Sequence, residues 1–274
     1  MRLLLTTDGS ETSKDVLKFG IQFYGLYKQQ ITVLTVIGSE EERAYGEAAL
    51  LSACKLLAPN VSEIQSKIRI GQVSEEILRE AKVGQNELIV LGAPGRGGFA
   101  KRLLMGPGIL RVVENAPCPV LIVKGPYRSI RKILLCDSGV EDSSLPGRFA
   151  IRYADLSEHE EEITILHVMS QISAGPGIPG KELRAEAEDL IQENTREGYV
   201  LDRNIQILNQ PLIHPHPKIR HGFVVDEILA ETQAGDYDLV IIGAHRKEGW
   251  QGILLDDLAK KIITQIDRSI LVVP

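Results

Sequence analysis

Apolar and polar positions alternate along the chain in blocks that predict short strands separated by helices. Continuous apolar runs such as Leu88–Leu91 are typical of strands that are buried on both faces. Between such runs, apolar residues recur at helical spacing, as in the stripe Val16, Phe19, Gly20 and Phe23. We therefore expect an α/β fold with a doubly wound parallel sheet and helices on both of its faces.

The pattern assigns five strands and four helices to the first half of the chain. A turn at Asp8–Ser13 can cap the first helix. A second helix is expected over Glu41–Leu57 with Ala48, Leu51 and Leu56 on its inner side, and Ser74 can cap a third that runs through Ala81. The remaining expected elements are strands at 3–7, 31–37, 64–70, 88–91 and 120–123, and a helix at 107–115.

The second half repeats the first. Five blocks recur in the same order: Leu3–Asp8 and Ile133–Asp137, Ile31–Val36 and Ile163–Val168, Gly71 with Glu76–Leu78 and Gly222 with Glu227–Leu229, Leu88–Ala93 and Leu239–Ala244, Pro119–Val123 and Ser269–Val273. This repeat predicts two tandem five-stranded domains, 1–126 and 127–274, separated at a Gly-Pro link. The last strand of each half is apolar and would be an exposed edge, so we expect the two strands to pair and form a pseudo-dimer within the chain.

Composition excludes several classes of protein. The net charge of −6 argues against general nucleic-acid binding, and no apolar run is long enough for a membrane span. The N-terminus enters a strand directly, so we expect no signal peptide. The three cysteines (Cys54, Cys118 and Cys136) are odd in number and lack CxxC spacing, which favours a reducing, cytoplasmic environment.

Glycines after the fourth strand suggest a site for an anion. Gly92 and Gly95 lie in the turn that follows this strand, and Gly106 and Gly108 lie at the start of the next helix. Glycine allows a close approach of the backbone, and free amides at a helix start can bind phosphate. The same glycines could also serve only as turn residues.

Three segments together resemble the universal stress protein family: Asp8-Gly9-Ser10, the glycine series Gly92/Gly95/Gly106, and Asn115–Val123. The resemblance covers nearly the whole length and identifies the chain as a tandem, two-domain member. It implies binding of an adenine nucleotide, ATP or AMP, with Mg²⁺ accompanying ATP. It also implies a stress-response role with an as yet unidentified protein partner, and leaves a homodimer open.

The resemblance also assigns roles to residues of the first half. Thr6 and Val36 would flank the base, and Asp8 would hold the ribose or adenine. Leu91 and Gly92 end the strand beside them. The phosphate side would be formed by Gly95, Gly106, Gly108 and Ile109.

The chain departs from the family's G-x2-G-x9-G-(S/T) pattern. Ten residues separate Gly95 from Gly106, and Pro107 replaces the Ser or Thr, so a hydroxyl and an amide donor are lost. In the second half Arg246 takes the place of Gly95, and Asp256-Asp257 replace Gly106-Pro107. Because these carboxylates would repel a phosphate, we interpret the second half as a degenerate, non-binding partner.

Catalysis is not predicted. The sequence has no Walker loop, nucleophile elbow or Ser-His-acid set, and no catalytic or metal-binding residue is assigned. Two alternatives to a regulatory nucleotide-binding protein stay open: an interaction protein with no nucleotide in either half, and a slow ATP hydrolase. In the first of these, Asp8 would serve only as a helix cap.

Two features of the second half have plain explanations. The run His214-Pro215-His216-Pro217, with His221 nearby, could suggest a metal site, but a stiff loop is favoured because no cysteine or carboxylate is near in sequence. Trp250 lies in the degenerate phosphate loop, where we expect it to cover the vacant pocket or to contact a partner.

Overall fold

The computed structural model describes residues 2–27, 30–93, 107–137, 160–169, 185–246, 253–254 and 256–273. The first half contains β1 (Leu3–Thr6), α1 (Glu11–Tyr27), β2 (Ile31–Ile37), the 3₁₀ turn η1 (Glu40–Glu42), α2 (Arg43–Leu57), β3 (Ile64–Ile70), α3 (Val73–Val83), β4 (Leu88–Gly92), α5 (Pro107–Asn115) and β5 (Val120–Val123). The second half contains β6 (Lys132–Asp137), β7 (Glu161–Met169), α7 (Ala187–Gln192), α8 (Arg196–Leu208), β8 (Ile213–His221), α9 (Val224–Ala234), β9 (Leu239–Gly243), β10 (His245–Arg246), β11 (Ile253–Leu254), α10 (Asp257–Gln265) and β12 (Ser269–Val273).

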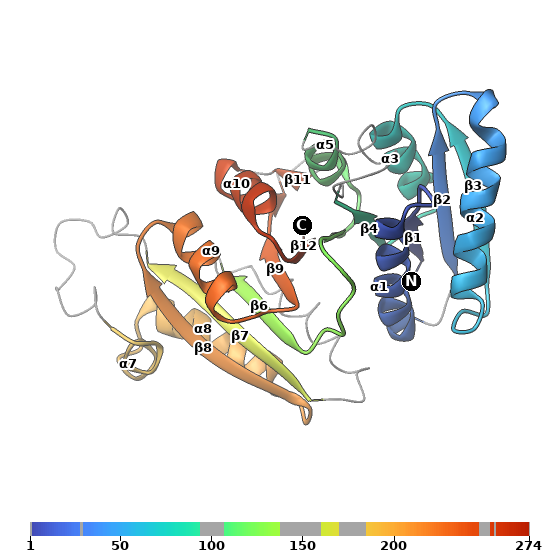
Figure 1. The fold of residues 1–274 in the computed structure, drawn as a ribbon. Coiled ribbons are helices and arrows are strands. Elements are labelled where there is room, and N and C mark those ends of the chain that lie inside the picture. The colour runs from blue at the N-terminus through green and yellow to red at the C-terminus, as the bar shows by residue number, and fades with distance from the viewer. Residues whose placement is uncertain are drawn as a thin grey trace.

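Ten strands form one mixed, mostly parallel sheet that runs through both halves (Figure 1). Its order is β3-β2-β1-β4-β5-β12-β9-β6-β7-β8, so each half contributes five strands with the same internal order. Neighbouring strands are parallel within each half, whereas β5 and β12 pair antiparallel with Ile122 opposite Ile270. The expected pairing of the two last strands is therefore confirmed.

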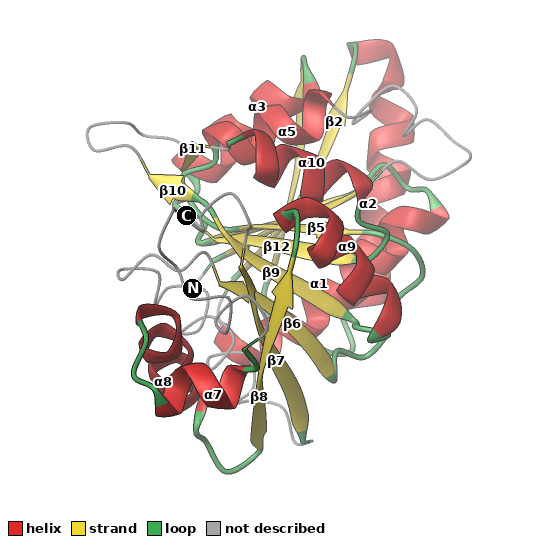
Figure 2. Ribbon diagram, turned by 90° about the vertical axis from the view of Figure 1, so that its left-hand side faces the viewer, coloured by secondary structure: helices red, strands yellow, loops and turns green. Residues whose placement is uncertain are grey.

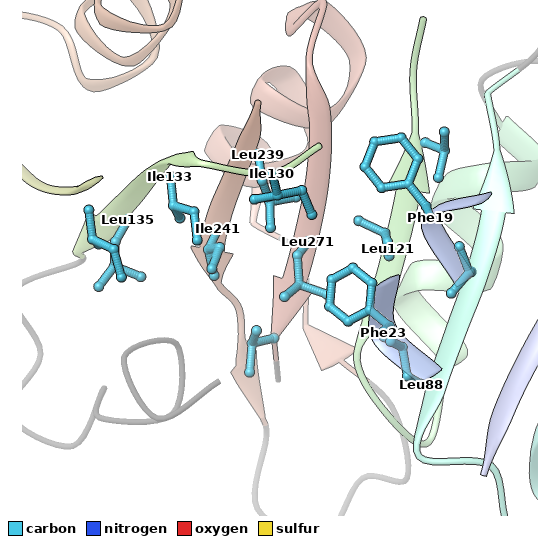
Figure 3. Packing of buried hydrophobic residues seen from close by; sticks show 14 of the residues in the cluster. Phe19, Phe23, Leu88, Leu121, Ile130, Ile133, Leu135, Leu239, Ile241 and Leu271 are labelled. Atoms are coloured by element: carbon cyan, nitrogen blue, oxygen red, sulfur yellow. The ribbon is translucent and has the colours of Figure 1, made fainter. Parts of the chain in front are cut away.

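Helices cover both faces of this sheet (Figure 2). Residues of α1, α2, α7 and α8 pack into one apolar core, and residues of α3, α5, α9 and α10 pack into the other. Phe19 and Phe23 of α1 belong to the same core as Leu121 of β5 and Leu271 of β12 (Figure 3). The apolar core thus continues across the junction of the two halves. In the described part of the chain, no helix is long and apolar enough to span a membrane.

The duplication extends to backbone conformation. Gly71 and Gly222 both end an edge strand with positive φ, +148° and +155° respectively. Gln85 and Asp236 each adopt a φ of 48°, an unusual value for residues with a side chain. Both pairs lie 151 positions apart in the sequence, so the two halves share their turns as well as their strands.

Each half also contains a buried glutamate bound by basic side chains. Glu80 of α3 receives hydrogen bonds from Lys67 Nζ at 2.7 Å and Arg69 Nε at 2.9 Å. Although burial raises its pKa, these bonds and charges outweigh burial and hold the pKa of Glu80 below its usual range. Their counterparts in the second half are Glu231, Lys218 and Arg220, joined by the Tyr237 hydroxyl at 2.8 Å.

The segment between the halves is held by polar and aromatic contacts. Lys124 Nζ donates to the carbonyl oxygens of Ile263 and Ile266, each at 2.6 Å, at the C-terminal end of α10. Burial lowers the pKa of Lys124 to about 8, with Asp267 opposing the shift. The Tyr127 ring packs edge-on against Phe19, with ring centroids 5.3 Å apart.

The expected inner side of the second helix is right at Leu56, which packs against the core, and wrong by about one residue at Ala48 and Leu51, which are exposed. Leu51 is 58% exposed, whereas Leu50 and Ala53 are buried. A Cβ on Gly46 would lie only 3.1 Å from Ile37 Cγ2, so Gly46 lets α2 approach the sheet along this other stripe. Ser74 does not cap the next helix, because α3 begins at Val73.

The predicted histidine–proline loop is also wrong, because residues 213–221 form strand β8 at the edge of the sheet. Proline lacks an N–H group and is compatible with a strand only where that group would face away from the neighbour. Glu160 Oε2 lies 3.9 Å from His214 Nε2, and the described residues contain no group of three or more potential metal ligands.

Candidate functional site

The candidate site lies at the carboxyl ends of β1, β2 and β4. Strand β1 is central among these, with β2 on one side and β4 on the other, so the chain changes direction across the sheet at this point. In open α/β sheets such a switch point leaves a crevice above the strand ends. A pocket with about 510 Å³ of empty space, partly open to solvent, occupies it.

One side of this pocket is apolar and the other is polar. Leu34 and Val36 of β2 form the apolar side together with Val73 and Ile77 of α3. The other described lining residues are Thr6, Thr7, Asp8, Ser10, Thr12, Ser13, Val16, Gly92 and Ala93. Such a pocket can receive a ligand that has both an apolar and a polar part.

Hydrogen bonds within the β1–α1 loop hold Asp8 in place. Its Oδ1 accepts from the Ser10 amide at 3.0 Å and from Ser10 Oγ at 2.5 Å. Gly9 has a φ of +76°, which lets the chain turn sharply here. The Tyr45 hydroxyl donates to the backbone oxygen of Asp8 at 2.5 Å. No hydrogen bond from a described residue reaches Asp8 Oδ2, so this oxygen can accept a bond from a ligand.

Hydroxyl groups extend this network beneath the loop. Thr7 Oγ1 lies 3.0 Å from Ser13 Oγ and accepts from the Gly9 amide at 3.2 Å. Thr35 Oγ1 in turn donates to the Thr7 backbone oxygen at 2.9 Å. Ser10 Oγ accepts from the Ser13 amide at 3.2 Å and thereby caps α1. The loop therefore has a fixed shape before any ligand arrives.

The structure brings four of the predicted binding residues together. Thr6, Asp8, Val36 and Gly92 all line the pocket. Leu91 does not line it, because its side chain is fully buried in the core. The roles of these residues toward a ligand stay predictions.

The predicted phosphate side is only partly described. Gly95 and Gly106 lie outside the described residues, as does Trp250 of the second half. Gly108 and Ile109 lie in the first turn of α5, which starts at Pro107 as expected, but they are not among the described lining residues of the pocket. First-turn amides have no acceptor within their helix, so those of Gly108 and Ile109 are available to an anion.

Sequence reasoning missed Val73 and Ile77 on the apolar side of the pocket. They come from the helix after β3, and that helix reaches the site only through packing of distant segments. A weak signal was present, because Gly71 and the Glu76–Leu78 block recur in the second half.

Strand register corrects one step in the comparison of the halves. Leu3 pairs with Ile31 in the first half, and Ile133 pairs with Ile163 in the second. Leu3 and Ile133 are therefore at equivalent positions. Asp137 is therefore equivalent to Thr7 rather than to Asp8, whose position is taken by Ser138. The apparent match of two aspartates arose from aligning blocks of different length.

The second half also differs at the helix that would meet a phosphate. Asp256 caps α10, and its Oδ1 accepts from the Ala259 amide at 2.7 Å. An internal carboxylate thus occupies the helix start that would otherwise attract an anion. Arg246, the counterpart of Gly95, lies in β10, which pairs with β11.

Comparisons with known proteins agree with this architecture. The model of the "Universal stress protein family" matches residues 1–124 and again 129–274. A universal stress protein of Methanocaldococcus jannaschii is 28% identical over 143 residues, which is 46% of this chain and 84% of that protein. One of Mycolicibacterium smegmatis is 23% identical over 249 residues, or 87% of this chain and 79% of that protein.

Solved structures show the same fold over the full length. The crystal structure of a universal stress protein from Archaeoglobus fulgidus matches with a TM-score of 0.67 at 19% identity, covering 99% of this chain and 95% of that one. A functionally unknown protein from Pseudomonas aeruginosa matches with a TM-score of 0.68 at 17% identity, covering 99% and 92%. The chain belongs to the universal stress protein family, with two of its domains in tandem.

Proposed function

We propose that this protein is a non-catalytic regulatory protein whose first half binds an adenine nucleotide, ATP or AMP. The observation that carries the proposal is the pocket at the switch point, with an apolar side and an aspartate held by its own loop. Family membership supplies the adenine, since members of this family often bind adenine nucleotides. With ATP, Mg²⁺ would accompany the phosphates.

Each side of the pocket has a separate task in this proposal. The base lies against Val36 and Ile77, where burial of apolar surface favours it. Asp8 Oδ2 accepts a bond from a ribose hydroxyl or from the adenine, while Oδ1 stays bound to Ser10. Beyond Gly92, the turn with Gly95 and Gly106 and the amides of Gly108 and Ile109 receive the phosphates.

The absence of a catalytic step is part of the proposal. Asp8 is the one carboxylate among the described residues that line the pocket, and the proposal assigns it to the ribose or the adenine. Hydrolysis would need a water aligned with the last phosphate, and Asp8 is assigned to the opposite end of the nucleotide. We therefore expect nucleotide binding without turnover.

A matched pair of variants tests the site. Val73 and its counterpart Val224 both begin a helix and are both half-buried, so a larger side chain should cost each half a similar amount of stability. Val73→Trp should fill the apolar side of the pocket and weaken binding of ATP, AMP and adenosine at least tenfold. Val224→Trp should leave binding unchanged.

Titration calorimetry with each ligand, with and without Mg²⁺, gives affinity and stoichiometry. One nucleotide per chain and loss only in Val73→Trp support the proposal. Two nucleotides per chain, or equal loss in both variants, would show that the second half binds. Absence of heat and of a thermal shift with every nucleotide favours the interaction-protein alternative, and phosphate release from ATP favours the hydrolase.

A further inference from the structure

The two outer edges of the sheet differ in what they offer to another strand. Strand β3 lies at one edge and β8 at the other (Figure 1). Toward β2, the Glu63 oxygen accepts from the Ile31 amide at 3.2 Å, and the Gly71 amide donates to the Ile37 oxygen at 3.0 Å. Odd-numbered residues of this segment thus face β2, and the even-numbered ones face outward because backbone groups alternate along a strand.

The outward positions of β3 are Ile64, Ser66, Ile68 and Ile70. All four have an N–H and a C=O, and no described strand pairs with them. Ile70 is 43% exposed at the end of the strand. Within the described part of the chain, this edge is therefore open for pairing along its whole length.

Strand β8 lacks a free N–H at three of its five outward positions, 213, 215, 217, 219 and 221. Toward β7, the Leu212 oxygen accepts from the Glu161 amide at 2.9 Å and the Gly222 amide donates to the Met169 oxygen at 3.2 Å, so odd-numbered residues face outward. Two of these, Pro215 and Pro217, have no N–H. The amide of a third, Ile213, donates to the Gln210 oxygen at 3.1 Å.

The edge at β3 carries N–H groups at the two positions where β8 has proline. Counting back from Gly71 and Gly222, Ser66 is the counterpart of Pro217 and Ile64 that of Pro215. Basic side chains often guard an edge, but here Lys67 and Arg69 are both bound to Glu80 of their own half. These ion pairs hold both side chains toward α3 instead of across the open edge.

We propose that β3 pairs antiparallel with β3 of a second copy of this chain, about a two-fold axis at Ser66. This register places Glu63 opposite Arg69 of the second copy and Gln65 opposite Lys67. It also places Ile64 opposite Ile68, which forms an apolar cross-strand pair. Among the described residues the Glu63 carboxylate accepts one side-chain hydrogen bond, from the Gln30 amide at 3.0 Å, and it forms no ion pair there, so it can meet an arginine.

Charge selects this register and this occupant. An axis at Lys67 would set two lysines opposite one another, and an axis at Ile68 would set Lys67 opposite Arg69. Directly opposed like charges destabilise a strand pair. An axis at Gln65 would also oppose unlike charges, Glu63 and Lys67, but it would set Ile64 against Ser66. Among these registers, the axis at Ser66 alone combines opposed unlike charges with an apolar pair, and this self-complementarity favours a second copy over an unrelated extended peptide.

The test transfers the closed edge onto the open one. Ser66→Pro copies Pro217 to the equivalent position, removing one outward N–H while leaving the pairing with β2 intact. Ser66→Val keeps the N–H and is the matched control. Light scattering and sedimentation over a concentration series should give twice the 30.2 kDa of one chain for the native protein and for Ser66→Val. Ser66→Pro should be monomeric with a similar unfolding temperature.

A charge variant tests the register. Glu63→Lys would face Arg69 twice in the symmetric dimer, so the dimer dissociation constant should rise about tenfold. Amide hydrogen exchange of the native protein provides a readout that needs no variant. Protection of Ser66 and Ile68 should increase with protein concentration, whereas the amides that already face β2 should not change.

Some results would overturn the proposal. These are a monomeric native protein at every concentration, a dimer that survives Ser66→Pro, or β3 amides whose exchange does not depend on concentration. Pairing of the native monomer with an extended peptide alone would show that the edge is open but that its occupant is not a second copy. Because none of these measurements involves nucleotide, they are independent of the proposed binding function.

Discussion

Both halves of the chain build the same apolar surface at the carboxyl ends of their strands, but they differ in the polar groups around it. In the first half this surface is formed by Leu34, Val36, Val73 and Ile77. Each of these has an aliphatic counterpart that packs into the same core: Leu166, Val168, Val224 and Ile228. The apolar half of the site is therefore duplicated.

The polar half is not duplicated. Thr6, whose Oγ1 lies 3.4 Å from the Val90 oxygen, is replaced by the buried Cys136. Ser138 stands in the position of Asp8, and Asp256 fills the helix start with its own carboxylate. The fold needs the apolar surface to close its core in both halves, whereas the polar groups contribute little to that core. Their loss from one half alone is what the proposed ligand site in the first half would lead us to expect.

The largest expected effect tests a feature that the halves share, the buried glutamate. Removing one member of a buried ion pair costs roughly 3 kcal/mol because the remaining charges lose their partner. Glu80→Ala should therefore lower the free energy of unfolding by about 3 kcal/mol. Glu231→Ala should cost about 1 kcal/mol more, since it also leaves the buried Tyr237 hydroxyl without its acceptor. Denaturant unfolding measures both.

Acid titration sharpens this result. The pKa values of Glu80 and Glu231 are lowered in the folded protein. A group whose folded pKa is lowered stabilises the protein above its unfolded pKa, and this stabilisation is lost as pH falls through the folded value. Native stability should thus decline below about pH 4.5, and each alanine variant should decline less. An equal decline in all three proteins would contradict the assignment.

A smaller effect concerns the two helix starts. Pro107 of α5 and Asp257 of α10 are the first residues of equivalent helices. Pro107→Ser restores one amide and one hydroxyl, and a bond to a charged group is worth about 1.5–3 kcal/mol. Affinity for ATP should rise about tenfold, and affinity for adenosine should change less. Equal gains for both ligands would show that this helix start does not face the phosphates.

The smallest effect concerns a contact that the first half makes across the junction. Lys124 binds two carbonyl oxygens at the end of α10, as a cation favourably does at a helix C-terminus. Lys124→Met should lower the free energy of unfolding by about 1 kcal/mol. The exposed pair of Lys132 and Glu162 offers a control, and Lys132→Met should change stability by less than about 0.5 kcal/mol. Equal losses of stability in the two variants would show that the Lys124 contact stabilises the protein no more than an exposed ion pair does.

The sequence predicted the fold well because its strands are buried on both faces and form continuous apolar runs. The buried faces of the helices were predicted less accurately. The predicted stripe of α2 was shifted because Gly46 lets this helix lie close to the sheet, which helical periodicity alone does not indicate. Strand β8 was taken for a loop, because only the register shows that the missing N–H groups of Pro215 and Pro217 face outward.

The site was predicted only where it follows strand ends. Thr6, Asp8, Val36 and Gly92 meet because the carboxyl ends of parallel strands lie together. Val73 and Ile77 depend on where α3 packs, which no local pattern indicates. The equivalence of Asp137 with Thr7 became clear only from strand pairing.

The antiparallel pairing of β5 with β12 also constrains how the protein is made. β12 is the last strand of the chain, and about 150 residues separate it from β5. At roughly 5–20 residues per second, a completed first half waits on the order of 10–30 s on the ribosome before β12 emerges. Throughout that interval the apolar strand Val120–Val123 is an uncovered edge. The nascent first half therefore exposes an apolar edge that is open to pairing with other chains until β12 covers it.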